Sequence, residues 1–500
     1  MRRPDRRPRL AEPRTGRLTE RTVDSFTSMF PRAAGVLAPL SSLGARHGIG
    51  DLGPEAYRFV DWLEAAGVTW WQMLPVVPVG PGNSPYASSS AFAGEPLYLS
   101  LQRLSEDGLL PSSQLSGPRE LRAGNVRYHD VRAFKEPRLQ RAFEAWQGGA
   151  GDRSDYDAFC DRAAAWLDPW CEVAAERAVA DGGDGAAASE RARFLQFQFD
   201  RQWGALRAYA AERGVRLMGD APIFVGLDSV DVVARPELFR LDEGGAPEVL
   251  TGVPPDPMNE DGQLWGHPHY AWDAHRADDY AWWRARMGHQ TELFDALRID
   301  HFIGFRNAFE VPADAENARG GAWAETPGEE LLDAIGDELG GLPLIAEDLG
   351  SVTDEVHALR DAYDLPGMRV LQWGFSPDSF HAPHRVPENA VVYPATHDND
   401  TCVGWWRGLD AGTKKRFRAL SGGDGRTVAS TMCRLACNSP AHTALLQLQD
   451  VLGLGRAART NPPGTAQGNW VWRLARRDLT AARARRLRDL LDATDRLADR

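Results

Sequence analysis

From residue 33 onward, short apolar runs alternate with longer segments whose apolar residues recur at helical spacing. This alternation is typical of βα units and predicts a parallel sheet, because parallel strands need a crossover helix between them. We therefore predict an α/β protein built on a (β/α)8 TIM barrel, with helical and irregular insertions between strands. The eight runs that qualify as barrel strands are Ala34–Ala38, Thr69–Leu74, Val215–Asp220, Leu297–His301, Leu342–Glu347, Met368–Trp373, Val391–Thr396 and Thr443–Leu448.

Two intervals between these strands exceed a compact barrel loop, and a third carries an extended helical pattern. Residues 100–212 are rich in Ala, Arg and Glu at helical spacing, which predicts an inserted, mainly helical subdomain. A second insertion, over residues 224–295, combines Pro-Pro, Gly and Trp-rich stretches before a helix, and a helical segment covers 405–440. We expect one catalytic unit over residues 30–500, since barrels with insertions reach this length.

The N-terminal stretch differs from the rest of the chain. Residues 1–28 contain eight arginines, with Pro and acidic residues between them, but no apolar core segment. They therefore do not form a secretory signal peptide. We expect a disordered, Arg-rich tail over 1–29, and hypothesise that translation of the native protein begins at Met29.

The composition restricts the possible partners and the compartment. With 43% hydrophobic and 25% charged residues, the chain is typical of a globular protein with a large core. A net charge of −13 argues against nucleic acid or an anionic membrane as a partner, because both require a basic surface. Five cysteines are few and odd in number, which favours a reducing cytoplasm over a disulfide scaffold. The oligomeric state stays open.

Three acidic residues each follow a short apolar run. Asp300 closes Arg298-Ile-Asp, Glu347 follows Leu344-Ile-Ala, and Asp398 follows the run that begins at Val391. Strand counting places them on strands four, five and seven, and the active site of a TIM barrel lies at the carboxyl ends of its strands. Any one of them alone is explained more simply as a helix cap or a surface ion pair. Together they favour glycoside chemistry, which uses pairs of carboxyl groups.

The neighbours of these acids suggest separate roles. Arg298 lies two residues before Asp300 on the same strand face, where its charge would keep Asp300 ionised, as a nucleophile requires. Glu347 stands at the edge of an apolar run, which predicts the raised pKa of a general acid. Net retention follows if these two carboxyl groups stand about 5 Å apart. Asp398 would then bind sugar hydroxyls as the ring flattens, and His397 is placed to hold the same sugar.

Other motifs favour blander interpretations. The pattern Gly48-Ile-Gly-Asp-Leu-Gly53 matches a dinucleotide fingerprint, but the acidic residue expected about twenty positions later is missing. The glycine-rich Gly80–Tyr86 lacks the Lys-Ser/Thr of a phosphate-binding loop. Pyridoxal chemistry needs a Schiff-base lysine, and the lysines at 135, 414 and 415 stand in surface-like contexts. We therefore expect no cofactor, and no metal cluster has recognisable spacing.

Two groups of residues could pack in the hydrophobic core rather than form a site. They are the cysteines at 433 and 437 and the tryptophans of the second insertion. Cys433 and Cys437 lie four apart on a predicted helix without partners for a zinc site, which favours packing. Sugar stacking and core burial both stay open for Trp265, Trp272, Trp282 and Trp283.

With these motifs in place, the chain resembles the 4-alpha-glucanotransferases, the amylomaltase or disproportionating-enzyme family related to the alpha-amylases. The resemblance runs in family order from about residue 32 to residue 475. Besides the three acid motifs, it is carried by Gly35–Leu43, His47–Gly53, Trp71–Pro75, Ser84–Tyr86, Ser90–Gly94, Gly219–Val225, Asp228-Ser229, Pro236–Phe239, Gly252–Asp256, Gly262–Gly266, Asn461–Thr465 and Asn469–Arg473.

The resemblance implies an enzyme that transfers alpha-1,4-glucan segments between maltooligosaccharides with retention. It assigns Asp300 as the nucleophile, Glu347 as the acid/base and Asp398 as the transition-state stabiliser. The residues that it places at the sugar are Asp220, Arg298 and His397 at the donor, and Tyr86, Trp265 and Asn469 near the glucan.

Two departures from the family pattern concern the acceptor. Pro257-Met258 stand where members usually carry an aromatic pair, and Ile303 replaces a common arginine. Both departures concern which acceptor sugar the enzyme prefers, and neither changes the reaction that the resemblance implies. Two alternatives stay open: an alpha-amylase-like retaining hydrolase with the same three acids, and a glucan-binding barrel without catalysis.

Overall fold

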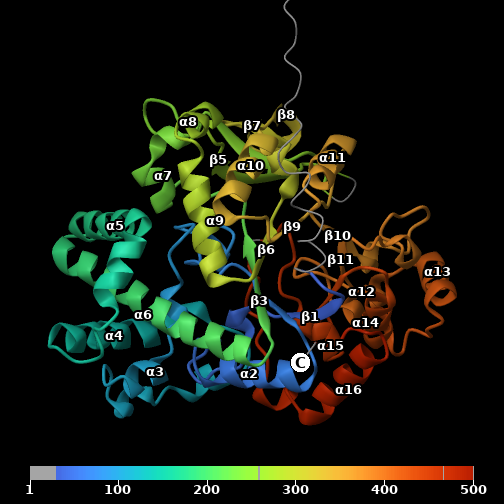
Figure 1. Ribbon diagram of the computed structural model, residues 1–500, viewed down its shortest axis with the longest axis horizontal. Coiled ribbons are helices and arrows are strands. Elements are labelled where there is room, and N and C mark those ends of the chain that lie inside the picture. Colours follow the sequence, from blue (N-terminus) through green and yellow to red (C-terminus); the bar gives the residue numbers. More distant parts are fainter. Residues whose placement is uncertain (1–29, 257–258, 466, 499–500) are drawn as a thin grey trace, which may run out of the picture.

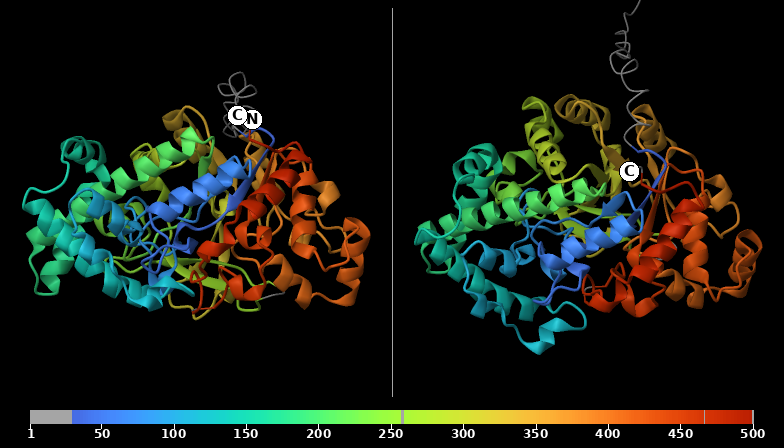
Figure 2. Two further views of the ribbon diagram at one scale, coloured as in Figure 1. Left: turned by 90° about the horizontal axis from the view of Figure 1, so that it is seen from below. Right: turned by 60° about the horizontal axis from the view of Figure 1, so that its bottom comes forward.

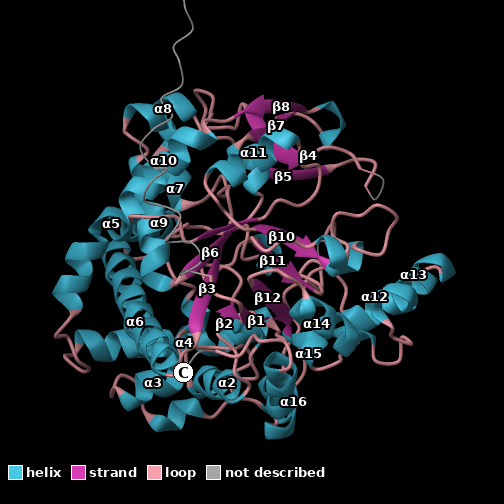
Figure 3. Cartoon of the chain, turned by 45° about the vertical axis from the view of Figure 1, so that its right-hand side comes forward, coloured by secondary structure: helices cyan, strands magenta, loops and turns pink. Residues whose placement is uncertain are grey.

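The structure is a computed structural model that describes residues 30–256, 259–465 and 467–498. The predicted tail over 1–29 and the departure at Pro257-Met258 lie outside the described residues. In the part described, one group of strands lies at the centre with helices around it, and a second group lies apart from it near the top of the view (Figure 3).

The central strands close into a barrel in which all pairings are parallel. Around the barrel the order is β1-β12-β11-β10-β9-β6-β3-β2. Each of the eight apolar runs overlaps one strand, so the predicted (β/α)8 barrel is confirmed. The strands are β1 (Ala33–Leu37), β2 (Trp70–Gln72), β3 (Arg216–Ala221), β6 (Ala296–Ile299), β9 (Leu344–Ala346), β10 (Gly367–Val370), β11 (Ala390–Tyr393) and β12 (Thr443–Gln447).

Inward-facing side chains fill the barrel as a separate apolar cluster. Trp70, Met218, Ile345 and Met368 belong to it and are fully buried. Gly35 on β1 leaves the room that Trp70 needs, because a Cβ at Gly35 would come within 2.7 Å of the Trp70 Cβ. Burying one such aliphatic side chain contributes about 1.5 to 3 kcal/mol. The interior is therefore a packed core, and chemistry is confined to the rim.

Helices cover the outside of the barrel, and two groups of them lie on opposite sides (Figures 1 and 2). One group comprises α3 (Leu101–Glu106), α4 (Tyr128–Gln147), α5 (Tyr156–Ala180) and α6 (Gly185–Glu212), which form the first insertion. The opposite group comprises α12 (Cys402–Gly408), α13 (Ala411–Ser421) and α14 (Val428–Asn438). The remaining helices are α2 (Pro54–Ala65), α7 (Val230–Ala234), α8 (Trp272–Ala277), α9 (Ala281–Leu293), α10 (Gly328–Leu339), α11 (Asp354–Ala362), α15 (Leu448–Val451) and α16 (Ala481–Asp492).

The first insertion is helical where its periodicity predicts helices, and its status as a subdomain stays a prediction. Buried polar groups hold its helix α6 in place. The Gln196 side chain accepts from the Gly94 N–H at 2.8 Å, in the loop before the insertion, and the Gln202 side chain accepts from the Ser100 N–H at 2.7 Å, at the start of α3. Because both glutamines are buried, these hydrogen bonds fix α6 against the segment that leads from β2 into the insertion.

Lys135 corrects the expectation of a surface lysine. Its side chain is fully buried, and its ammonium donates to Asp51 Oδ2 at 3.1 Å and to the carbonyls of Leu97 and Leu99 at 2.6 and 2.9 Å. Three acceptors match the three protons of the ammonium group, which makes the buried charge tolerable. Lys135 therefore joins α4 to the loop before α2, and its nitrogen is occupied.

A second sheet, which the apolar pattern does not reveal in full, lies beside the barrel. Its antiparallel strands are β4 (Val249–Val253), β5 (Gln263–Pro268), β7 (Asn307–Pro312) and β8 (Ala322–Glu325), in the order β5-β4-β7-β8. The strands β7 and β8 lie between Asp300 and Glu347, where the apolar pattern predicts no strand. The reason is that β8 is a largely exposed edge strand and β7 ends in proline, so neither has the apolar signal of a buried strand.

In the part of the chain that the structure describes, no helix has both the length and the apolar character needed to span a membrane.

Candidate active site

Asp300 and Glu347 follow adjacent barrel strands. The pairing of β6 with β9 sets Ile299 opposite Ala346, and each acid is the next residue after its strand. The Asp300 N–H donates to the Ala221 carbonyl at 3.0 Å, and the Glu347 N–H donates to the Ile299 carbonyl at 3.1 Å. The barrel's hydrogen bonding thus continues through both residues. Their placement on strands four and five is as predicted.

A buried arginine, Arg298, binds the carboxylates of both Asp220 and Asp300. Arg298 Nη1 donates to Asp300 Oδ1 at 2.9 Å and to the two Asp220 oxygens at 2.7 and 2.9 Å. Burial raises the pKa of Asp220, and the Arg298 charge opposes that rise. Burial alone would lower the pKa of Arg298, yet the carboxylates of Asp220 and Asp300 raise it well above its ordinary value. Arg298 therefore stays charged beside Asp300.

Glu347 lies in a different electrostatic setting. Burial raises its pKa well above the ordinary carboxyl range, and the negative charge of Asp300 adds to that rise, whereas Arg298 opposes it. The direction agrees with the apolar run before it. Glu347 Oε2 also accepts from the His301 N–H at 2.7 Å. His301 adopts a left-handed backbone with φ 53°, a conformation uncommon outside glycine.

Asp398 lies farther from its strand than the other two acids. The strand β11 ends at Tyr393, so Asp398 stands on the loop that precedes α12. Asn461 Nδ2 donates to Asp398 Oδ1 at 2.6 Å, and Arg459 donates to the Asp398 carbonyl at 2.7 Å. The Asp398 side chain is 41% exposed, against 29% for Asp300. It is thus the more open of the two.

One continuous network connects Asp398 with Asp300. His397 Nε2 lies 3.3 Å from Asp398 Oδ2 and 2.9 Å from the Tyr86 hydroxyl. That hydroxyl donates to Asp220 Oδ2 at 2.7 Å, and Asp220 binds Arg298, which reaches Asp300. The Tyr86 and His397 rings stack at a centroid distance of 5.4 Å. The structure therefore brings four predicted sugar-binding residues together between the two acids.

Trp265 and Asn469 lie outside this network of hydrogen bonds. Trp265, on β5, meets the His301 ring edge-on at a centroid distance of 4.8 Å, so it stands next to the residue that follows Asp300. Asn469 Nδ2 donates to the carbonyl of Thr465 at 2.7 Å, within its own loop. Asn469 approaches the site through its neighbour Trp470, whose ring lies 5.6 Å from that of Tyr86.

The other tryptophans of the second insertion pack in the core. Trp282 and Trp283 are buried, and Trp272 is half-buried against Tyr270, 5.1 Å away between ring centroids. All five cysteines are free, and Cys433 and Cys437 are buried as expected. Within residues 30–256, 259–465 and 467–498, no group of three or more His, Cys, Asp or Glu side chains is arranged to hold a metal ion.

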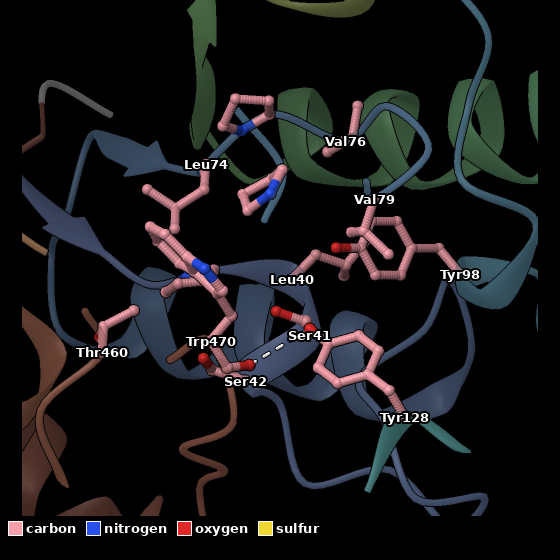
Figure 4. A pocket seen from close by; sticks show the side chains of 13 residues that line it. Leu40, Ser41, Ser42, Leu74, Val76, Val79, Tyr98, Tyr128, Thr460 and Trp470 are labelled. Atoms are coloured by element: carbon pink, nitrogen blue, oxygen red, sulfur yellow. Dashed lines mark hydrogen bonds between the residues drawn. The ribbon is translucent and has the colours of Figure 1, made fainter. Parts of the chain in front are cut away.

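Arg459, Asn461 and Trp470 support the site and were not assigned a role from sequence. Trp470 has a left-handed backbone with φ 64°, which is rare for so large a side chain, and the Tyr128 hydroxyl donates to its carbonyl at 3.2 Å. Behind its ring lies a cavity of about 10 Å³, lined in part by Ser41, Leu74 and Thr460, with room for about one water (Figure 4). Asn461 and Asn469 lie in motifs of the family resemblance, which is the only signal that could have singled them out.

A (β/α)8 barrel with acids after its fourth, fifth and seventh strands is the framework of a barrel enzyme that processes glycosidic bonds. Comparison with known proteins makes this specific. A family model described as 4-alpha-glucanotransferase matches residues 38–184 and 174–480. The chain belongs to the 4-alpha-glucanotransferase family, which confirms the resemblance seen in the sequence.

Relatives in bacteria and plants cover nearly the whole chain. The 4-alpha-glucanotransferase of Thermus thermophilus is 40% identical over 93% of this chain and 99% of its own length. The chloroplastic/amyloplastic 4-alpha-glucanotransferase of Arabidopsis thaliana is 40% identical over 93% of this chain and 86% of its own. Among solved structures, the amylomaltase from Streptococcus agalactiae in complex with acarbose superposes with a TM-score of 0.88 at 31% identity, covering 93% of this chain and 99% of that chain.

Proposed function

We propose that the chain transfers alpha-1,4-glucan segments between maltooligosaccharides by a retaining double displacement. The observation that carries this proposal is the contrast between two adjacent carboxyl groups. Asp300 lies 2.9 Å from a buried arginine, whereas burial raises the pKa of Glu347 well above the ordinary range. One group is therefore suited to be an ionised nucleophile and the other to be a protonated acid.

In the first step, an Asp300 oxygen attacks the anomeric carbon of the donor glucan. The bond to the departing glycosidic oxygen breaks, and that oxygen takes the proton of Glu347. A covalent glycosyl-enzyme and a shortened glucan with a new 4-hydroxyl group result. The Glu347 carboxylate that remains lies near the Arg298 charge, which favours its ionised form until the acceptor arrives.

In the second step, the 4-hydroxyl of an acceptor sugar attacks the same carbon from the face that the first sugar left. Glu347 takes the proton of that hydroxyl, the bond to Asp300 breaks, and both carboxyl groups return to their starting states. Two inversions at one carbon give net retention. Transfer exceeds hydrolysis when an acceptor sugar occupies the site in place of water.

The remaining site residues are assigned to holding the sugar. Asp398 hydrogen bonds to ring hydroxyls as the donor sugar flattens, and His397 shares that task. Arg298 and Asp220 fix the Asp300 side, and Tyr86 joins the two sides through its hydroxyl. Trp265 and Asn469 are assigned to the glucan-binding surroundings, whereas Ile303 is buried in the hydrophobic core.

The proposed partners are maltooligosaccharides, and the proposed compartment is the cytoplasm. The free cysteines, four of them buried, support a reducing environment. With 13 net negative charges, the chain has no overall attraction to nucleic acid or to an anionic membrane.

Maltotriose distinguishes transfer from hydrolysis. Incubation with the purified chain should give glucose and longer maltooligosaccharides, separated by chromatography, while the number of reducing ends stays constant. The Glu347→Gln variant is the matched control and should give neither product. A steady rise in the number of reducing ends would contradict transfer and indicate a hydrolase. Unchanged maltotriose would favour a glucan-binding barrel without catalysis.

A further inference from the structure

The loop that carries Asp398 is held by a segment that follows the last barrel strand. Asn461 contacts this loop twice: its side-chain amide donates to Asp398 Oδ1 at 2.6 Å, and its backbone N–H donates to the His397 carbonyl at 3.1 Å. Arg459 adds a hydrogen bond to the Asp398 carbonyl at 2.7 Å. The carboxylate and the backbone on both sides of it are thus fixed by one short segment.

This segment is itself anchored to the barrel. Gln449, a buried residue of α15, donates from its amide to the Ala458 carbonyl at 3.1 Å and to the Thr460 hydroxyl at 2.9 Å. The Trp470 N–H donates to the Thr460 carbonyl at 2.8 Å, and Arg459 Nε donates to the Asn461 carbonyl at 3.1 Å. The Asn461 amide therefore reaches Asp398 from a support that is connected to β12 through α15.

The orientation of the Asn461 amide follows from its partner. An ionised carboxylate only accepts hydrogen bonds, so the nitrogen of the amide must face Asp398. A donor to a charged oxygen makes a stronger hydrogen bond than a donor to a neutral oxygen. The Asn461 amide thus hydrogen bonds to Asp398 Oδ1, whereas Asp398 Oδ2 faces His397.

We propose that Asn461 is a positioning residue whose amide holds the Asp398 carboxylate in one orientation for the transition state. This rests on the proposed function, in which Asp398 binds sugar hydroxyls as the donor ring flattens. Asn461 lies 63 positions from Asp398 in the chain and acts through that acid.

The Asn461→Asp variant tests this role through its dependence on pH. A protonated carboxyl at 461 donates to Asp398 as the amide does, whereas an ionised one repels it. Two facing carboxyl groups share one proton and lose it together at a raised apparent pKa. The ratio of variant kcat to native kcat should therefore be near one at pH 5 and fall about tenfold or more by pH 8, with KM changed much less.

The charged and titratable groups around Asp398 do not produce this pattern by themselves. His397 contacts the Asp398 carboxylate, Tyr86 contacts His397, and Arg459 contacts the Asp398 carbonyl. All three are present in both proteins, so the variant adds one titratable group, the carboxyl at position 461. Asp400 lies two residues further along and is paired with Arg456, whose Nε is 2.6 Å from Asp400 Oδ2. The step in the ratio would thus report the new carboxyl.

Two further variants separate positioning from folding and from added charge. Asn461→Ala removes the donor without adding a titratable group, so its kcat should be about tenfold lower at every pH, since a hydrogen bond to a charged group is lost. Asn438→Asp adds the same charge at an exposed end of α14 and should match the native protein. Thermal unfolding of each variant shows whether it is folded. If Asn461→Asp does not fold, the kcat of Asn461→Ala alone tests the positioning role.

Asp398→Asn distinguishes failure of this inference from failure of the proposed function. If Asp398→Asn is inactive while both Asn461 variants keep native kcat from pH 5 to pH 8, the positioning role is overturned and the proposed function stands. If Asp398→Asn keeps native kcat, Asp398 loses its assigned role. A kcat ratio for Asn461→Asp that falls as pH rises, together with a uniform loss for Asn461→Ala, supports the inference.

Discussion

The two ends of the active-site network are held in different ways. Asp300 follows its strand directly and lies against the buried charge of Arg298. Asp398 stands on a loop, is more exposed, and is held by the neutral amide of Asn461 and by backbone contacts. In the proposed mechanism, the nucleophile, which must keep one charge and one position, is built into the barrel wall. The group proposed to follow the changing shape of the sugar ring lies on a loop held by hydrogen bonds.

Glu347 shows why position on a strand alone does not decide a role. It is as close to its strand end as Asp300, yet its pKa is raised by burial, whereas Asp300 has a guanidinium 2.9 Å away. The difference between the two acids therefore lies in their surroundings: Arg298 hydrogen bonds to Asp300 directly, whereas it only partly offsets the effect of burial on the pKa of Glu347.

The largest expected effect is the loss of turnover when the nucleophile is removed. Asp300→Asn should lower kcat on maltotriose by at least about 10³-fold, because the covalent intermediate can no longer form. Folding should be spared, since Asp220 still neutralises Arg298. Glucose release and the thermal unfolding midpoint measure the two effects, and native turnover in the variant would remove Asp300 from the mechanism.

Breaking the charge pair on the Asp300 side should destabilise the fold strongly. Arg298→Met leaves the buried Asp220 without its counter-charge, which costs about 3 to 5 kcal/mol in the free energy of unfolding. Arg306→Met is the matched control, because its pair with Glu325 is exposed and should cost no more than about 1 kcal/mol. Denaturant unfolding measures both, and equal costs would contradict a buried ion pair at the Asp300 side.

On the Asp398 side, the stability should depend on pH through Asp450. This carboxyl accepts from the Cys402 N–H at the start of α12, and burial raises its pKa from 3.8 to about 7. Because the folded state holds the proton more tightly than the unfolded state, Asp450 lowers stability as pH rises from about 4 to about 7. Asp450→Asn keeps the accepting oxygen, so its stability relative to the native protein should rise over that interval. Unfolding free energies that differ by a constant amount at pH 4 and pH 7 would contradict this.

The smallest expected effect concerns the alkaline limb of the pH profile of kcat/KM. Activity should fall as pH rises through the raised pKa of Glu347, since the acid must be protonated to act. Arg298 and Asp300 help to set that pKa, whereas Asn461 hydrogen bonds to Asp398 at the other end of the network. The limb should therefore stay in place in Asn461→Ala although kcat falls, and a displaced limb would show that the two sides are not independent.

The barrel and the order of the acids could be predicted because barrel strands are buried on both faces. Such strands form short continuous apolar runs, and the acids interrupt them at one end. The exposed edge strand β8 lacks that signal, so the second sheet was missed in part. Lys135 was assigned to the surface because its partners are two backbone carbonyls and an aspartate 84 positions away, which no local pattern reveals.

The part of the site that could be predicted from sequence consists of residues close to the ends of barrel strands. Arg298 lies on β6 and Asp300 directly follows that strand, two residues on, so their contact follows from spacing alone. The contact of Asn461 with Asp398 spans 63 positions and joins two loops, and the links through Tyr86 span 134 and 311 positions. Such contacts depend on how the closed barrel brings its loops together, which the sequence pattern does not specify.

The central claim, that Asp300 is the nucleophile and Glu347 the acid/base, is tested most directly by trapping the intermediate. In Glu347→Gln, an activated alpha-glucosyl fluoride can still glucosylate the nucleophile because fluoride leaves without a proton, but the acceptor is no longer deprotonated. Peptide mass spectrometry should then find one glucosyl group on the peptide that contains Asp300. A glucosyl group on another residue, or turnover with no adduct and an inverted anomer, would contradict the account.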